Sequence, residues 1–141
     1  MALHNEIGRL GEDAACEYLR KRGYKIVERN WRLGNIEIDI IAEDKNFVVF
    51  VEVKTRTTMY ADVSPEQYAD ALKQKFMTVA GNAYMKHKNS DKNLRFDICG
   101  ILWNMQTNSP DNIHYYENAF HPQLKSVNPS SYNGQWRWTR R

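Results

Sequence analysis

Residues 36–55 read IEIDIIAEDKNFVVFVEVKT, and this stretch decides the fold. Its first half alternates isoleucine with acidic residues, and its second half is rich in valine and phenylalanine. Both patterns are typical of β-strands. The polar residues 43–46 between them are a turn signal, so we predict an antiparallel hairpin with strands over residues 36–42 and 47–55.

The charged side chains of this hairpin are its most informative feature. With a loop over residues 43–46, Ala42 would face Phe47 and Glu37 would lie opposite Glu52. Because side chains alternate along a strand, three carboxylates and one ammonium group would then share a face, and three isoleucines would share the other. The predicted charged face holds Glu37, Asp39, Glu52 and Lys54, and the predicted apolar face holds Ile36, Ile38 and Ile40.

Three neighbouring carboxylates need a compensating charge. Like charges on an apolar sheet are unfavourable by desolvation and by repulsion, and a divalent cation is the simplest remedy. Carboxylate oxygens without nearby histidine or cysteine favour Mg²⁺ or Mn²⁺ over zinc. The competing interpretation is a solvent-facing strand on which Lys54 neutralises Glu52, because exposed charges on strands are common.

The hairpin is preceded by a helical pattern and a strand. Apolar residues recur at helical spacing over residues 6–22, and Gly23 stands where a helix-ending glycine belongs. Residues 24–31 then predict a strand, and a turn around Gly34 leads into the hairpin.

The hairpin is followed by a second helical pattern. Ser64 and Asp70 are alternative starts for this helix, which should end near Met85. Strands are predicted over residues 94–103 and 113–117. The element order is therefore αβββαββ, and the helix between the third and fourth strands implies a crossover. We expect an α/β fold with a mixed central sheet flanked by helices.

Composition indicates one globular domain and no membrane segment. The chain has 141 residues, 42% of them hydrophobic and 26% charged. The apolar stretches are too short to span a bilayer and the start lacks a signal-peptide pattern, so we expect a cytoplasmic protein. Cys16 and Cys99 should be reduced core thiols, and the histidines lack ligand spacing.

The C-terminal end differs from the body of the chain. Residues 121–141 contain four Lys or Arg and no Asp or Glu, so this segment carries +4 and the rest of the chain −1 of the net charge of +3. We therefore divide the chain into a domain over residues 1–120 and a basic, tryptophan-containing tail over residues 121–141. The tail composition suits phosphates and stacked bases, although a loosely docked terminus whose tryptophans cover a groove explains it as well.

Several segments together resemble a known family. The spacing of Asp39, Glu52 and Lys54 is similar to the PD-(D/E)XK signature of the restriction-endonuclease-like fold. The segments GRLGEDAACEYLRKRGYKIVERNW, EIDIIAED, VVFVEVKTRT, RFDI and ENAF resemble the YraN family of small bacterial proteins over about residues 8–120. The resemblance implies a restriction-endonuclease-like αβββαβ core.

The resemblance also implies roles for the acidic residues. Asp39 and Glu52 would hold the metal, and Lys54 would be the partner of the attacking water. Glu12 resembles the first-helix glutamate of archaeal Holliday-junction resolvases, although its place beside the apolar helix stripe predicts exposure. A second metal would bind through Glu37.

Three further residues are candidates for nucleic-acid binding. Arg56 shares the strand face of Glu52 and would contact a flanking phosphate. Lys73 and Gln74 match the family's K-Q pair at the start of the second helix, and a solvated helix face is the competing interpretation for both.

Two functions follow from these residues. The first is a Mg²⁺-dependent or Mn²⁺-dependent endonuclease that hydrolyses phosphodiester bonds of DNA, with branched or structured DNA as the expected substrate. The second is a non-catalytic or weakly catalytic nucleic-acid-binding module that retains the fold. The acid cluster favours the enzyme, whereas the near-neutral body is unlike a strong DNA clamp. A homodimer would supply a larger basic surface and two sites.

Overall fold

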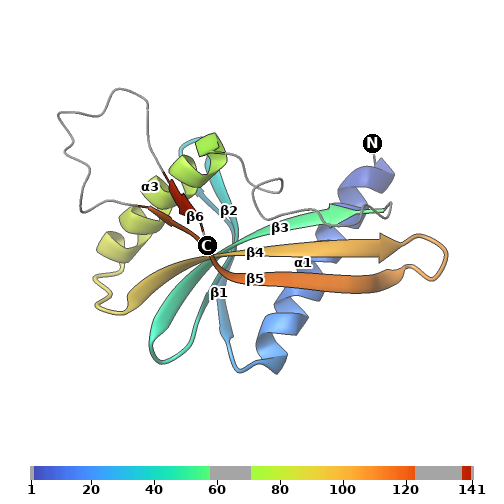
Figure 1. Cartoon of the computed structure of the whole chain (residues 1–141), viewed down its shortest axis with the longest axis horizontal. Coiled ribbons are helices and arrows are strands. Elements are labelled where there is room, and N and C mark those ends of the chain that lie inside the picture. The colour runs from blue at the N-terminus through green and yellow to red at the C-terminus, as the bar shows by residue number, and fades with distance from the viewer. Residues whose placement is uncertain (1, 58–70, 123–137, 141) are drawn as a thin grey trace.

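The computed structural model describes residues 2–57, 71–122 and 138–140. In these ranges the chain forms two helices and six strands (Figure 1). The elements are α1 (Ala2–Lys21), β1 (Lys25–Leu33), β2 (Ile36–Glu43), β3 (Phe47–Arg56), α3 (Ala71–His87), β4 (Asn93–Asn104), β5 (Ser109–Pro122) and β6 (Trp138–Arg140). The predicted order αβββαββ is thus confirmed, and β6 is added to it.

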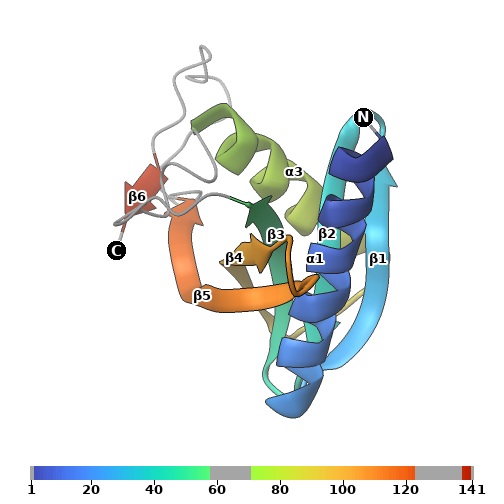
Figure 2. The same ribbon diagram turned by 90° about the vertical axis from the view of Figure 1, so that its right-hand side faces the viewer.

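All six strands belong to one mixed sheet with the order β1-β2-β3-β4-β5-β6. Neighbouring strands are antiparallel except β3 and β4, which are parallel and are connected through α3. The predicted crossover and the α/β class are therefore confirmed. Figure 2 shows β5 curving away from the central strands to reach β6.

The strand β5 is longer than predicted and begins before the turn-rich segment ends. Asn108, with a φ of 53°, closes the turn, and Pro110 already pairs with Trp103. A register shift between Leu102 and Trp103 accompanies this pair. A proline is tolerated at such an irregularity because its missing N–H interrupts little of the ladder.

The two helices pack on opposite faces of the sheet, each over its own apolar core. Under α1, Leu19 and Cys16 pack with the buried residues Val49, Val51 and Cys99. Under α3, the buried core residues are Ile38, Ile41, Val48, Phe50, Met77, Ala80, Tyr84, Met85, Phe96, Ile98 and Phe120. Both cysteines are free and buried, as expected.

The helix α1 ends as its sequence predicts. Gly23 has a φ of 90°, its N–H donates to the carbonyl of Arg20, and the N–H of Tyr24 donates to the carbonyl of Leu19. This pair of bonds is a Schellman motif, which requires a left-handed residue. The predicted start of the second helix at Ser64 lies outside the described residues, and α3 is described from Ala71.

The register of the β2–β3 hairpin differs from the prediction by two residues. Ala42 pairs with Val49 and not with Phe47. The reason lies in the turn, where Asp44 Oδ1 accepts hydrogen bonds of 2.8 Å from the N–H groups of Asn46 and Phe47. This tight turn lets β2 extend to Glu43, which the prediction had assigned to the loop.

The alternation of isoleucines along β2 is also interrupted. Ile38 packs in the core under α3, but Ile40 packs in the core under α1. The prediction that Ile36, Ile38 and Ile40 share one face is therefore wrong for Ile40. Asp39 lies between the two, so β2 changes the face of its side chains at Asp39.

Candidate active site

Asp39 lies where the β2–β3 ladder opens. The last described pair of this ladder is Ile40 with Val51, although β2 begins at Ile36 and β3 continues to Arg56. Beyond that pair, Asp39 Oδ2 accepts a hydrogen bond of 2.8 Å from the N–H of Val53. The carboxylate thus takes the place of a strand partner at the fork between the two strands.

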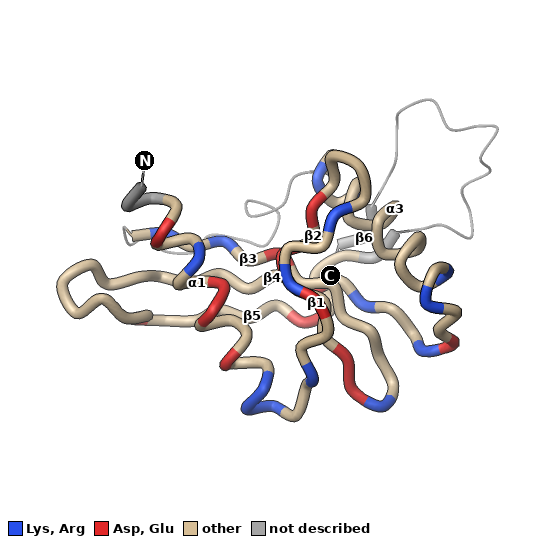
Figure 3. The backbone as a smooth tube through the Cα atoms, turned by 180° about the vertical axis from the view of Figure 1, so that it is seen from behind, with Lys and Arg blue, Asp and Glu red and all other residues tan. Residues whose placement is uncertain are grey.

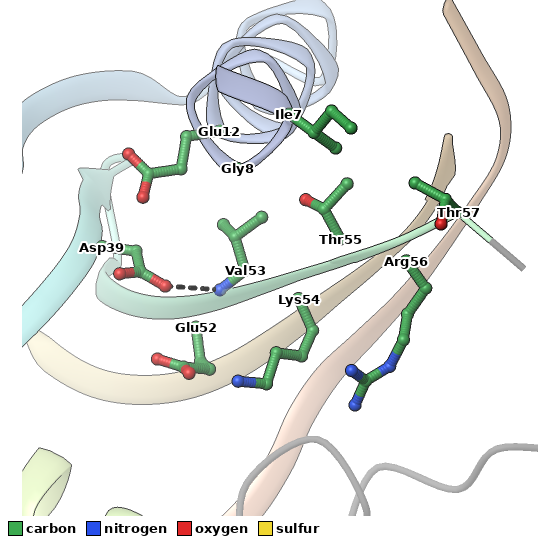
Figure 4. Close-up of a pocket in the computed structure, with 10 residues that line it drawn as sticks. All are labelled: Ile7, Gly8, Glu12, Asp39, Glu52, Val53, Lys54, Thr55, Arg56 and Thr57. Atoms are coloured by element: carbon green, nitrogen blue, oxygen red, sulfur yellow. Dashed lines mark hydrogen bonds between the residues drawn. The ribbon is translucent and has the colours of Figure 1, made fainter. Parts of the chain in front are cut away.

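The fork opens into a cavity of about 540 Å³. Residues of α1 and of the second half of β3 line it together with Asp39 (Figure 4). On one side of β3 lie Glu12 and Gly8 of α1, and on the other side lie the side chains of Glu52 and Lys54. Asp39, Glu52 and Lys54 therefore meet at one cavity, as the hairpin pattern predicted.

Glu52 is buried beside two lysines. Its residue is 5% exposed, and its Oε1 atom lies 3.4 Å from Nζ of Lys73 on α3. The same atom makes no hydrogen bond to any residue that the structure describes. Burial raises the pKa of Glu52, while the charges of Lys73 and Lys54 oppose that rise.

Asp39 is the second perturbed carboxyl at the cavity. Burial, and next the charge of the neighbouring Glu52, raise its pKa to about 7, against the bond from the N–H of Val53. The lysines beside Glu52 lower the pKa of these acids without cancelling the effect of burial, so the pair still lacks a full counter-charge. A hard cation between them would supply one, because it favours the ionised form of both carboxyls.

A third carboxylate comes from α1. Glu12 lines the cavity, and its side chain is only 19% exposed, so the expectation that it is exposed is wrong. Burial and the charge of Asp39 raise the pKa of Glu12. Asn30 Nδ2 donates to both of its oxygens at 3.1 and 3.4 Å, and Arg29 Nη2 lies 3.6 Å from Oε1.

Glu37 does not join this cluster. It is absent from the cavity wall and instead contacts Arg32 Nη2 at 3.4 Å through Oε1. Glu37 and Arg32 are direct partners in the β1–β2 ladder, which explains the pairing. The prediction that Glu37 converges with Asp39 and Glu52 is wrong, and Glu12 is the third acid in its place.

The three residues predicted to bind nucleic acid differ in their exposure and position. Arg56 is exposed, lines the cavity and projects from β3 on the same side as Lys54 (Figure 4). Lys73 reaches Glu52 directly. Gln74 is only 2% exposed and lies beneath the surface, so direct contact with nucleic acid loses its support.

The donor set suits a hard divalent cation that keeps much of its water. Across the described ranges, no three His, Cys, Asp or Glu side chains come together as a ready-made metal cage. Mg²⁺ needs no such cage, since it usually binds through one or two carboxylates, water and substrate phosphate. Asp39 and Glu52, with a buried oxygen that lacks a hydrogen bond, fit this requirement.

Charge over the rest of the chain is mixed. Figure 3 shows basic and acidic positions interspersed along the described backbone. Within that part of the chain, no helix has both the length and the apolar character needed to cross a bilayer.

Asn30 and Arg29 are the site residues that the sequence did not reveal. Both belong to β1, which was interpreted only as a strand. The available signal was an asparagine inside that strand, because asparagine is depleted in strands and tolerates a left-handed backbone. Here Asn30 has a φ of 52°.

Comparisons with known proteins agree on a family. The model of "Uncharacterised protein family UPF0102" matches residues 11–101. A UPF0102 protein of Bacteroides thetaiotaomicron is 44% identical over 125 residues, which cover 88% of this chain and 99% of the relative. A UPF0102 protein of Flavobacterium johnsoniae is 46% identical over 105 residues, covering 72% of this chain and 85% of the relative.

Among solved structures, the chain is similar to that of an fdxN element excision controlling factor protein from Anabaena variabilis. It is 12% identical, and the match covers 80% of this chain and 98% of that chain. The TM-score is 0.25, so this likeness supports no inference about the chain.

Proposed function

The chain belongs to the UPF0102 (YraN) family, and from this membership and the geometry of the fork we propose that it is a metal-dependent endonuclease acting on DNA. The observation that carries the proposal is the meeting of Asp39, Glu52 and Lys54 at one cavity. Two buried acids beside a lysine are costly for a protein that only binds a polyanion, because they repel phosphate.

Asp39 and Glu52 would hold Mg²⁺ or Mn²⁺. When bound, such an ion supplies positive charge to the phosphoryl oxygens and lowers the pKa of a coordinated water. The carboxylate of Asp39 is fixed for this role by the N–H of Val53. Glu52 is fixed by its position in β3, which pairs with β4 on both sides of it, from Phe47 to Arg56.

Lys54 would orient the attacking water and stabilise negative charge on the transferred phosphoryl group. Figure 4 shows its ammonium group directed toward Glu52, at the edge of the cavity. Arg56 follows on the same side of the strand and would hold a flanking phosphate. Lys73, whose Nζ lies 3.4 Å from Glu52 Oε1, would neutralise charge at Glu52.

DNA with branches or other structure is the proposed substrate, and the cytoplasm is the compartment in which the protein would meet it. The second candidate is a weakly catalytic or non-catalytic nucleic-acid-binding module. The interspersed charges do not separate the two candidates, because a strong clamp for linear duplex would need a basic face in either case. A homodimer would bring two sites to a branched substrate and enlarge the weakly charged binding surface.

The test is cleavage of linear, flapped and four-way DNA in Mg²⁺ or Mn²⁺. Asp39→Asn, Glu52→Gln and Lys54→Met should each lower the cleavage rate by at least about 100-fold. Glu37→Gln is the matched control, since it changes an acid of the same strand outside the cavity and should retain activity. Binding without cleavage, unaffected by the three variants, would favour the second candidate.

A further inference from the structure

The strand β1 has an irregularity at Asn30. On either side of it, Arg29 pairs with Ile40 and Trp31 pairs with Ile38 in regular antiparallel register. Asn30 itself has a φ of 52°, in the left-handed region that strands normally avoid. In this register Asn30 lies opposite Asp39 of β2, the residue at the fork between β2 and β3.

The irregularity turns the side chains of β1 from one face of the sheet to the other. Arg29 reaches α1, where its Nη1 lies 2.8 Å from Asp13 Oδ1. Trp31 instead packs edge-on against Tyr84 of α3, with the ring centroids 5.2 Å apart. Residues two apart on a regular strand share a face, so β1 changes face at Asn30, just as β2 does at Asp39.

The change of face has a consequence for Glu12. Arg29 and Asn30 are consecutive and would point to opposite faces of a regular strand. Here both reach the Glu12 carboxylate, Asn30 by two hydrogen bonds and Arg29 by an ion pair. The left-handed backbone of Asn30 therefore accompanies the hydrogen bonds of its side-chain amide to Glu12.

We propose that Asn30 is a positioning residue, whose left-handed backbone and side-chain amide hold the Glu12 carboxylate toward Asp39, so that Glu12 adds its charge to the cation site of Asp39 and Glu52. This inference rests on the proposed function. Asparagine suits the position because it both tolerates a positive φ and carries an N–H donor. Glycine would satisfy the backbone alone, which allows the two contributions to be separated.

The supporting geometry is on the cavity side of α1. Figure 4 shows the Glu12 carboxylate extending from the helix to the side on which Asp39 lies. Without the amide, a glutamate on a helix has several staggered rotamers available. The partner that orients a metal ligand typically contributes 10- to 100-fold to metal affinity, so the loss should be measurable.

The experiment is calorimetric titration of the full-length protein with Mn²⁺ alone. Asn30→Gly should weaken Mn²⁺ binding by about tenfold in the otherwise unchanged protein, and Glu12→Ala by at least as much. In the Glu12→Ala background, Asn30→Gly should cause no further loss, because the amide then has no carboxylate to position. Asn30→Asp, which keeps the left-handed preference but repels Glu12, is the second variant and should also weaken binding.

Asn89→Gly is the matched control, since Asn89 has a φ of 54° but follows α3 and is not part of the cavity wall. It should bind Mn²⁺ like the unchanged protein. Equal losses from Asn30→Gly with and without Glu12, or no loss at all, would overturn the inference and leave the proposed function standing. If the unchanged protein fails to bind Mn²⁺, the proposed function itself fails, and the inference with it.

Discussion

Asp39 Oδ2 accepts the N–H of Val53 at 2.8 Å, at the point where the ladder between their strands has ended. This bond shows that the candidate site is a product of the sheet opening. A carboxylate on a regular strand would project from one face, whereas Asp39 reaches across to the neighbouring strand. The fork thereby positions one acid from β2 next to another from β3, and the wall of α1 adds the third.

The raised pKa of Asp39 predicts an inverted pH dependence of stability in the metal-free protein. Between the ordinary pKa of 3.8 and about 7, the folded protein holds a proton that the unfolded chain has released. The free energy of unfolding should therefore fall as the pH rises through this window, by up to about 1.4 kcal/mol per pH unit. Urea denaturation in EDTA at pH 5.5 and 7.0 measures it.

Asp39→Asn is the control for this measurement, because an amide has no proton to release. The decrease should be shallower in that variant. A free energy of unfolding that rises steadily from pH 5.5 to 7.0 in the unchanged protein, and equally in Asp39→Asn, would contradict the interpretation.

The ammonium group of Lys73 lies where a metal cation would contact Glu52, and this predicts the effect of replacing Lys73. Its Nζ lies 3.4 Å from Glu52 Oε1, so its charge stabilises the buried carboxylate and opposes a second cation there. Lys73→Met should lower the stability of the metal-free protein by about 1–3 kcal/mol and strengthen Mg²⁺ or Mn²⁺ binding several-fold. Denaturation and calorimetric titration measure the two effects.

Lys92→Met is the comparison for Lys73→Met, since Lys92 also pairs with a glutamate, Glu43, but away from the cavity. It should leave metal binding unchanged. Weaker metal binding in Lys73→Met would show that Lys73 supports the cation and does not compete with it.

The sequence predicted the acids of β2 and β3 for a physical reason. Side chains repeat every two residues along a strand, so the two-residue error in register did not change which residues of β2 and β3 share a face, up to the last pair, Ile40 with Val51. The element order and the crossover followed from hydrophobic periodicity, which is clear in α1 and weak in α3, where Leu72, Phe76 and Val79 are exposed. Their catalytic and metal-binding roles remain predictions.

The rest of the site depends on features that a periodic pattern does not contain. The change of face of β1 at Asn30 coincides with one positive φ, and the alternation of residues along β1 does not predict it. Glu37 does not reach the cavity because it stays in the regular β1–β2 ladder opposite Arg32, and Glu12 lines the cavity instead. Helical periodicity likewise gave Glu12 no reason to be buried, since its partners come from β1.

Two glycines of α1 predict opposite responses to the same substitution. A Cβ at Gly11 would overlap Thr55 Oγ1 and approach Thr55 Cβ to 3.0 Å, so Gly11→Ala should push α1 away from β3 and cost about 1–3 kcal/mol. A Cβ at Gly8 would meet nothing within 4 Å, so Gly8→Ala should stabilise the helix by about 0.5–1 kcal/mol. Chemical denaturation of both variants measures the difference, and equal effects would contradict this close helix–strand contact.

Asp97 predicts a stability effect that is separable from the site. Its residue is 0% exposed, and its oxygens accept hydrogen bonds from Arg95 at 2.9 and 3.0 Å, from Tyr115 at 2.6 Å and from the N–H of Asn118 at 2.8 Å. Asp97→Asn would leave the guanidinium of Arg95, which is 8% exposed, without its buried counter-charge.

Loss of one partner from a buried ion pair costs about 3–5 kcal/mol, and we expect Asp97→Asn to lower the free energy of unfolding by that amount. Asp97 is not part of the cavity wall, so the fraction that remains folded should bind Mn²⁺ with unchanged affinity. Asp111→Asn is the matched control, because Asp111 is exposed and accepts only the amide of Asn104 among the described contacts. It should change stability by less than about 1 kcal/mol. A small effect of Asp97→Asn by comparison would show that the remaining acceptors, Tyr24 Oη and Glu117, solvate Arg95 well enough without the charge of Asp97.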